Sequence, residues 1–194
     1  SGEGIINCAI LALEHFGLPL PTREQMRVFV GPPLHETFVK FGVPADKTDE
    51  AIQVYRSRYI PIGKFENHPY DGIQNVLEKL KAMGHTLYVA TSKPETMASD
   101  ILQYFDLKQY FTIICGAVPG GRSTKEEVIA HLLTQLNSKE NLIMVGDTIY
   151  DVKGAAYHQI PCIAVTWGYG DVEDMKDAGA DIAETSDALY ELLK

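Results

Sequence analysis

Two aspartates lie just beyond a short apolar run, in a pattern that could hold a metal ion. The segment Gly146-Asp147-Thr148-Ile149-Tyr150-Asp151 directly follows Leu142-Ile143-Met144-Val145. An ionised carboxylate at the end of a buried strand needs a partner, because an unpaired charge resists removal from water. Mg²⁺ prefers oxygen ligands, keeps several waters and usually shares its shell with a substrate phosphate. We therefore expect Asp147 to bind a metal, with Asp151 as a second ligand or a support. In the alternative interpretation, Asp151 is a helix N-cap and Asp147 a solvated loop residue.

A hydroxyl and a lysine follow a second apolar run, which ends at Ala90. The tripeptide Thr91-Ser92-Lys93 precedes Pro94, which is expected in the first turn of a helix. A hydroxyl next to free backbone N–H groups at a helix start can bind a phosphate. This segment is a candidate phosphate site, although the same tripeptide is also an ordinary helix cap.

A glycine pair precedes another lysine in Gly120-Gly121-Arg122-Ser123-Thr124-Lys125. Glycines allow the backbone to approach a ligand closely. Lys125 falls in the first turn of a predicted helix, where the helix dipole disfavours a cation, so we expect it to face an anion. The order of residues does not match a Walker A loop. Arg122 and Lys93 are close enough in sequence to help attract a dianion. A flexible surface loop carrying surface charges is the alternative.

The elements that position these residues alternate from Asp71 onward. Short apolar runs are predicted as strands at 86–91, 111–115, 142–145, 160–166 and 181–183, with helices between them. Unalternated strands separated by helices are typical of a parallel sheet covered on both faces. The first 65 residues, in contrast, have helical periodicity, with Gly17 ending the first helix and Thr22 and Gln25 forming a capping-box pattern. The fold class is therefore α/β, with a Rossmann-like parallel sheet and a helical insertion. In such sheets, function collects at the carboxyl ends of the strands.

Composition excludes several classes of protein. The chain of 194 residues has 26 acidic and 17 basic side chains, for a formal charge of -9. This balance disfavours nucleic acid and anionic membranes as partners. The three cysteines, Cys8, Cys115 and Cys162, have no C-x-x-C pairing and are expected to be reduced core residues in a cytoplasmic protein.

Together, the three loops resemble motifs two, three and four of the haloacid dehalogenase superfamily, in its phosphoglycolate-phosphatase-like branch. Thr91 matches the motif-two hydroxyl, Lys125 the motif-three lysine, and Asp147 with Asp151 the acidic fourth motif. The resemblance extends over nearly the whole chain. It implies a first helix at a core–cap junction (1–16), a small helical cap (17–68) and an α/β core (69–194). Within the cap, Val30-Gly31-Pro32-Pro33-Leu34 resembles the turn that closes over the substrate, which implies substrate-binding roles for Gly31 and Pro32.

The first motif of the family, a D-x-D-G-T loop with the nucleophilic aspartate, has no match in this sequence. Ser1-Gly2-Glu3-Gly4-Ile5 resembles the residues that follow that loop. In the family the loop ends the central strand of the sheet, whose loss would leave neighbouring strands with unpaired backbone groups. We therefore expect the natural protein to have a segment upstream of Ser1 that supplies both.

The resemblance implies a Mg²⁺-dependent phosphatase acting on a small phosphorylated metabolite through an aspartyl-phosphate intermediate. In this scheme Thr91, Lys125, Asp147 and Asp151 are catalytic, Asp147 and Asp151 hold the metal, and Ser92, Lys93, Gly31, Pro32 and Arg122 bind substrate. A sugar phosphomutase and a catalytically silent phosphate-binding or metal-binding module are the alternatives, whereas a Mg²⁺-independent dehalogenase is disfavoured by Asp147. The expected protein is a monomer or weak homodimer.

Overall fold

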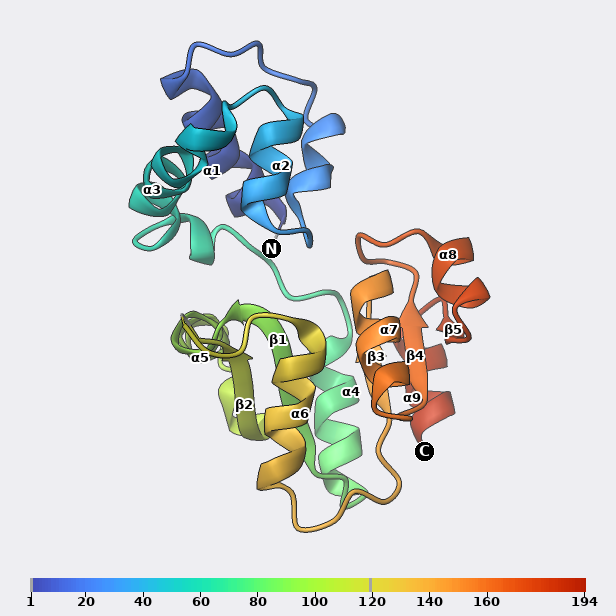
Figure 1. The fold of residues 1–194 in the computed structure, drawn as a ribbon. Helices are drawn as coiled ribbons and strands as arrows, with labels where there is room; N and C mark the ends of the chain where they lie inside the picture. Colours follow the sequence, from blue (N-terminus) through green and yellow to red (C-terminus); the bar gives the residue numbers. More distant parts are fainter. Residues whose placement is uncertain (1, 119) are drawn as a thin grey trace. The chain divides into compact units, whose positions relative to one another are not determined.

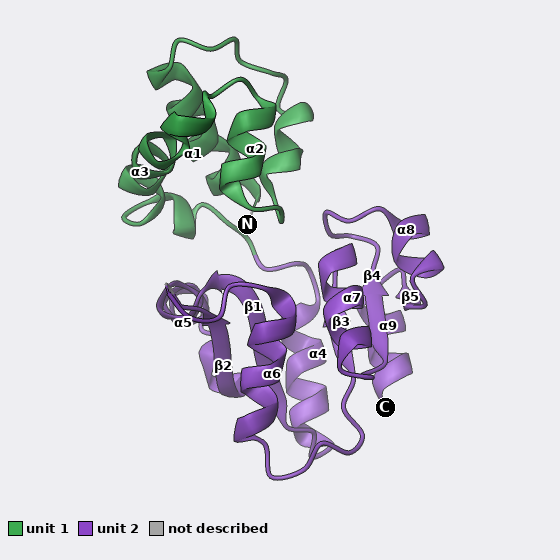
Figure 2. Ribbon diagram, viewed as in Figure 1, with its two compact units in different colours: residues 1–68 green, residues 69–194 purple. Residues whose placement is uncertain are grey.

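The computed structural model describes residues 2–118 and 120–194 and divides the chain into two compact units, 1–68 and 69–194 (Figures 1 and 2). Ser1, the first residue of the segment that resembles the sequence after motif one, lies outside the described residues. The α1 helix groups with the first unit. None of the helices described here has the length and apolar character needed to cross a membrane.

Unit 1 is helical, as its periodicity predicts. Its elements are α1 (Gly2–His15), η1 (Gln25–Phe29), α2 (Leu34–Lys40), η2 (Ala45–Lys47), α3 (Thr48–Tyr59) and η3 (Gly63–Phe65), where η marks a 3₁₀ helix. Gly17 follows the end of α1 with a φ of 61°, as expected of a helix C-terminus. The Thr22 and Gln25 capping bonds form, but the turn that follows them is 3₁₀ rather than α-helical.

Aromatic side chains fill the core of unit 1. Phe38 is fully buried, and its ring lies 5.1 Å from Phe29 and 6.4 Å from Tyr55. The α3 helix is tied to the end of the unit by Arg58, which donates to both carboxylate oxygens of Glu66 at 2.7 and 2.6 Å. Unit 1 therefore has a core of its own.

Unit 2 alternates helices and strands and confirms the predicted α/β class. Its elements are α4 (Ile73–Ala82), β1 (Leu87–Pro94), α5 (Glu95–Tyr104), η4 (Lys108–Tyr110), β2 (Phe111–Ala117), α6 (Lys125–Gln135), β3 (Met144–Gly146), α7 (Ile149–Tyr157), β4 (Cys162–Val165), α8 (Val172–Asp177), β5 (Asp181–Ala183) and α9 (Ser186–Leu193). All strand pairs are parallel. Helices cover both faces of the β3-β4-β5 sheet: α4 and α9 on one side, α7 and α8 on the other (Figure 1).

The strands form two sheets rather than the single sheet expected from the sequence. The β1 strand pairs with β2 alone, and β3 is the edge of the sheet β3-β4-β5. Every residue of β4 is buried, whereas the residues of β1 and β3 are at most half-buried. Parallel strands are normally buried on both faces, so β1 and β3 are less covered than is usual for such strands.

An apolar slot of about 420 Å³ accompanies the two edges within unit 2. Val89 and Ala90 of β1, Met144 and Val145 of β3, and apolar side chains of α4, α6 and α9 line it. Unpaired strand edges are templates for further strand pairing. The β1 and β3 edges are therefore next to apolar space in the described part of unit 2.

The three cysteines are free and buried, as their isolation in the sequence predicts. Cys115 belongs to a small cluster with Val128 and Leu132, which packs α6 against β2. Cys162 begins β4 and packs with Val152 of α7. Their thiols thus act as small apolar core groups.

Replacing Leu13 with alanine tests the core of unit 1. Leu13 is completely buried in α1, whereas Leu11 of the same helix is 36% exposed. We expect Leu13→Ala to lower the free energy of unfolding by about 2–5 kcal/mol, because it leaves a cavity. Leu11→Ala should change it by no more than about 0.5 kcal/mol. Urea unfolding followed by circular dichroism measures both, and equal effects would contradict this packing.

Candidate active site

Lys125 lies at the centre of the site and links two parts of unit 2. It is the first residue of α6, whose N-terminus is fixed by a capping box between Thr124 and Glu127. Its Nζ donates to the carbonyl oxygen of Ala90 at 2.9 Å and pairs with Asp151 Oδ1 at 2.7 Å. The side chains of the lysine and its aspartate are only 10% and 8% exposed. The pair therefore connects the β1–β2 sheet with the start of α7.

Gly154 makes room for the stem of Lys125. A Cβ atom at position 154 would lie 2.5 Å from Lys125 Cγ, closer than real carbon contacts allow. The α6 and α7 helices can therefore approach each other only while residue 154 has no side chain. Sequence reasoning missed this glycine, because a lone glycine within a helix is a weak signal.

Asp151 supports the site through both of its carboxylate oxygens. Oδ1 pairs with Lys125, while Oδ2 accepts bonds from the backbone N–H groups of Asp147 at 3.2 Å and Thr148 at 3.0 Å, and from the Thr148 hydroxyl at 2.8 Å. Because α7 begins at Ile149, Asp151 falls in its first turn and forms a capping box with Thr148. The structure thus gives Asp151 a capping and lysine-positioning role, and its direct ligation of a metal stays a prediction.

Asp147 has the free oxygen that a metal ligand needs. Its Oδ2 accepts the Tyr169 N–H at 3.1 Å, and no described residue donates a hydrogen bond to its Oδ1. Removal from water and the nearby charge of Asp151 raise the pKa of Asp147, while the Tyr169 N–H, Lys125 and Lys93 oppose this rise. A bound divalent cation would offset both the cost of removing the Asp147 carboxylate from water and its repulsion from Asp151. A carboxylate oxygen is also the donor that Mg²⁺ prefers. The residue therefore fits a magnesium ligand.

Asp151 is the carboxylate that lies next to Asp147. Across residues 2–118 and 120–194, no three His, Cys, Asp or Glu side chains gather in a group that could hold a metal. An ion on Asp147 would need further oxygens from water, from a substrate phosphate or from a segment outside these residues.

The segment after β4 also contacts Asp147. Gly168 packs so closely that a Cβ there would lie 2.1 Å from Asp147 Cβ, and the Gly170 N–H donates to the Asp147 carbonyl oxygen at 2.8 Å. The functional interpretation of the sequence did not include these glycines. A G-x-G pattern directly after a strand is the signal that could have identified them, since such glycines often mark a close backbone approach.

The predicted phosphate-binding tripeptide ends β1. Lys93 donates its backbone N–H to the Thr91 hydroxyl at 3.2 Å, which turns the chain at this point, and Ser92 is exposed. Burial lowers the pKa of Lys93, whereas Asp147 raises it and Lys125 lowers it further. Lys93, Lys125 and Asp147 therefore interact electrostatically, and Thr91 directly follows Ala90, the carbonyl partner of Lys125.

Arg122 is engaged away from this cluster. It forms an ion pair with Glu95 and donates through Nε to the Gly116 carbonyl oxygen at 2.7 Å, while the Gly116 N–H donates to Glu95 at 3.2 Å. These bonds tie the loop before α6 to the start of α5. Arg122 thus shapes the loop that carries Lys125, and its predicted contact with substrate gains no support.

Gly31 and Pro32 belong to unit 1. They lie between η1 and α2, and Gly31 adopts a φ of 114°, which requires glycine. Their predicted contact with substrate stays a prediction.

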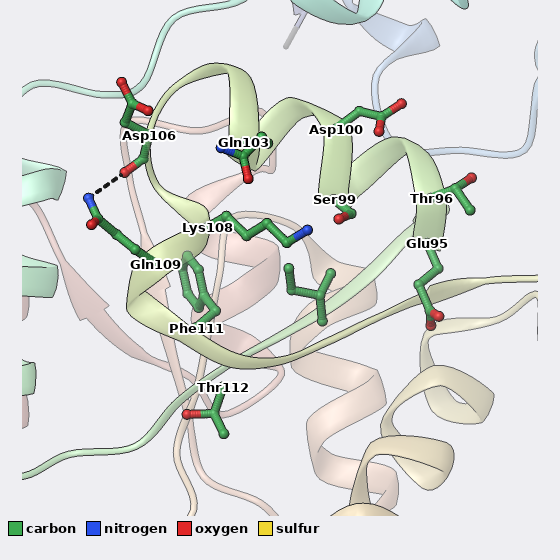
Figure 3. A pocket seen from close by; sticks show the side chains of 11 residues that line it. Glu95, Thr96, Ser99, Asp100, Gln103, Asp106, Lys108, Gln109, Phe111 and Thr112 are labelled. Carbon is green, nitrogen blue, oxygen red and sulfur yellow. Dashed lines mark hydrogen bonds between the residues drawn. The ribbon is translucent and has the colours of Figure 1, made fainter.

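A second cavity of unit 2, about 790 Å³, lies elsewhere. Figure 3 shows it beside α5 and β2, with Lys108 extending between the helix and Phe111. Of the residues discussed above, only Glu95 lines it. The size of this cavity is therefore no guide to the chemistry at Lys125 and Asp147.

Asp147→Asn tests the electrostatics of this site. Burial raises the folded-state pKa of Asp147, so keeping the carboxylate ionised at neutral pH costs folding free energy. Asparagine can still accept the Tyr169 N–H but carries no charge. In EDTA at pH 7 we expect Asp147→Asn to melt at a higher temperature than the wild type.

The advantage of the variant should shrink as the pH falls through the raised pKa toward the ordinary aspartate range, because the wild-type carboxyl then becomes protonated. Calorimetry of both proteins at several pH values measures this. A variant no more stable than the wild type at pH 7 would contradict the assignment.

Comparison with known proteins identifies the family. The model of the haloacid dehalogenase-like hydrolase family matches residues 1–165. The tyrosine-protein kinase PtkA of Mycobacterium tuberculosis is 40% identical over 198 residues, covering 100% of this chain and 68% of that protein. A 5'-nucleotidase of Pseudomonas aeruginosa is 37% identical over 177 residues, covering 90% of this chain and 80% of its own length. The crystal structure of a predicted phosphatase from Clostridium acetobutylicum superposes with a TM-score of 0.92 at 38% identity, covering 99% of this chain and 91% of its own. The chain therefore belongs to the haloacid dehalogenase-like hydrolase family.

Proposed function

We propose that the working form of this protein is a Mg²⁺-dependent phosphatase that hydrolyses a small phosphorylated metabolite. The observation that carries the proposal is the position of Lys125, held between the carbonyl oxygen of Ala90 and Asp151 Oδ1. This arrangement brings together the ends of β1 and β3 and the start of α6, which carry the hydroxyl, the carboxylate and the lysine of the three matched motifs.

Each residue has a role that follows from its surroundings. Lys125 stabilises negative charge on the transferring phosphoryl oxygens, because its position is fixed before substrate arrives. The Thr91 hydroxyl donates a hydrogen bond to one of those oxygens. Lys93 adds a second positive charge for the dianion, and Asp151 keeps Lys125 in place. Asp147 would hold Mg²⁺, which when bound would supply positive charge to the phosphoryl oxygens.

The nucleophilic aspartate that the family resemblance implies lies upstream of residue 1, on a strand that occupies the slot between β1 and β3. The slot is largely apolar and is lined by β1 and β3, each of which pairs with only one other strand among the described residues. A parallel strand there would end beside Thr91 and Asp147, since the carboxyl ends of parallel strands meet at one edge of a sheet. In this scheme the carboxylate attacks phosphorus while the P–O bond to the substrate alcohol breaks, and the alcohol leaves with a proton from solvent. Water then attacks the aspartyl phosphate, which releases inorganic phosphate and regenerates the carboxylate.

The relatives suggest the class of substrate. One is named a 5'-nucleotidase and another a phosphoglycolate phosphatase, the latter 35% identical over 135 residues. We propose a nucleoside monophosphate or a small phospho-acid as substrate, with Gly31 and Pro32 of unit 1 as parts of a cap. The proposed enzyme is cytoplasmic and needs neither nucleic acid nor membrane as a partner.

A second candidate is phosphoryl transfer to a protein tyrosine, which the 40% identity with PtkA favours. Both reactions would use the same charged groups around the phosphoryl group. They differ in the acceptor, which is water in one and a tyrosine hydroxyl in the other.

Lys125→Ala tests the proposed chemistry. In the full-length protein with Mg²⁺, we expect it to lower kcat by about 10²–10³-fold, because a pre-positioned donor to the phosphoryl oxygens is lost. Lys153→Ala changes an exposed lysine on α7 and should leave kcat unchanged. Phosphate release from a panel of nucleoside monophosphates and phospho-acids measures this.

Unchanged turnover in Lys125→Ala would refute the role of the lysine, provided that its melting temperature shows a folded protein. No Mg²⁺-dependent release from any ester by the wild type would refute the phosphatase. Label transferred from γ-labelled ATP to tyrosine, in the absence of phosphatase activity, would favour the second candidate.

Hydrogen exchange tests the proposed strand. The amides of β1 and β3 that face the slot should exchange at least tenfold more slowly in the full-length protein than in the chain of residues 1–194, because pairing protects them. The amides of β4, already paired on both sides, serve as the internal reference. Equal exchange at β1 and β3 in both proteins would contradict a strand in the slot.

A further inference from the structure

The segment Thr166–Gly170 contacts Asp147 at several points, although it follows a different strand. The Tyr169 N–H donates to Asp147 Oδ2 at 3.1 Å, and the Gly170 N–H donates to the Asp147 carbonyl oxygen at 2.8 Å. The segment leaves β4, which pairs with β3 immediately before Asp147. Both the backbone and the side chain of Asp147 are therefore oriented by this one segment, which we call the 166–170 loop.

Close packing makes this orientation strict. A Cβ at Gly168 would lie 2.1 Å from Asp147 Cβ and 2.4 Å from its Oδ2. A Cβ at Gly170 would lie 2.5 Å from the Asp147 carbonyl oxygen. The loop and the aspartate thus have little freedom to move independently, and a displacement of one must be accommodated by the other.

The loop is anchored at its base by Trp167, the single tryptophan of the chain. This residue packs against the apolar cluster of α4, β4, β5 and α9. Its ring also meets Tyr70 edge to face, with centroids 6.5 Å apart and an interplanar angle of 76°. Tyr70 is the second residue of unit 2, directly after the boundary between the two units at His68 and Pro69.

These contacts form a continuous path from the segment that joins the units to the carboxylate of Asp147. Tyr70 touches Trp167, Trp167 is bonded to Gly168, and Gly168 packs on Asp147. Tyr70 is 42% exposed, so its ring contributes little to the core and is accessible to change.

We propose that the 166–170 loop is a positioning element for Asp147, and that Tyr70, through Trp167, couples the segment joining the two units to metal binding. The inference rests on the proposed function, since it takes Asp147 as the magnesium ligand. It assigns Tyr70, Trp167 and Gly168 as positioning residues that act through Asp147. By thermodynamic linkage, a conformation of the joining segment that changes the free energy of Mg²⁺ binding is itself favoured or disfavoured by bound Mg²⁺ by the same free energy.

The test is isothermal titration of the full-length protein with Mg²⁺ alone. Loss of an edge-to-face contact corresponds to a change of about two- to tenfold in an equilibrium constant. We therefore expect Tyr70→Ala to weaken Mg²⁺ binding about two- to tenfold and Tyr70→Phe, which keeps the ring, to bind like the wild type. Gly168→Ala should weaken binding further, because its Cβ would displace the carboxylate.

The matched control is Tyr157→Ala, which removes another edge-to-face ring of unit 2. Tyr157 is 74% exposed, and its ring meets His158 edge to face. It should bind Mg²⁺ as the wild type does. Trp167 fluorescence gives an independent readout: Mg²⁺ should change the emission of the wild type, and Tyr70→Ala should need two- to tenfold more Mg²⁺ for the same change.

The outcomes separate this inference from the proposed function. Equal Mg²⁺ affinity in wild type and Tyr70→Ala would overturn the coupling and leave the phosphatase standing. Failure of Tyr70→Phe to restore affinity would likewise overturn the role of the ring contact. A wild type that binds no Mg²⁺ would overturn both. Thermal melts of each variant identify any that fail to fold, and Tyr70→Ala, at a partly exposed position, keeps the test decisive if Gly168→Ala does not fold.

Discussion

The ion pair between Lys125 and Asp151 is the interaction on which unit 2 depends. The two sheets share no strand pairing, and Lys125 joins them by bonding at once to Ala90 of β1 and to Asp151 of α7. Removing one partner of such a buried pair typically costs about 3–5 kcal/mol, because the other charge is left without compensation. The lysine thus has a structural role beside the catalytic role proposed for it. Both roles would require a single fixed position of its ammonium group.

Much of the fold could be predicted from periodicity and helix signals. Gly17 at the end of the first helix and Lys125 in the first turn of α6 lie where expected, because the signals that mark helix ends are local. The division of strands into two sheets could not be predicted in this way, because strand pairing depends on residues far apart in sequence. The short 3₁₀ turn after Thr22 shows the same limit, since capping bonds fix where a turn begins but not its pitch.

The sequence named residues of the candidate site, but it could not show which partners each side chain has. The spacing of Asp147 and Asp151 predicted a metal ligand together with a second ligand or a support. Spacing alone could not show that α7 begins at Ile149, so that Asp151 caps this helix and pairs with Lys125. Arg122 was expected to help attract a dianion because of its place in the sequence, which gave no sign of its ion pair with Glu95, 27 residues away. Side-chain partners so far apart in sequence cannot be predicted from residue spacing, whereas local backbone constraints such as helix ends can.

The capping box of α7 has a further consequence for how the site meets an anion. The N-terminus of a helix usually offers free N–H groups and a positive dipole end to a bound phosphate. In α7, Asp151 accepts the N–H groups of Asp147 and Thr148 and places its own charge at that end. The Asp151 carboxylate therefore offsets the positive dipole end of α7. In the proposed function, an anion would therefore meet side-chain cations and a bound metal at short range, and the net charge of -9 would give no long-range attraction toward it.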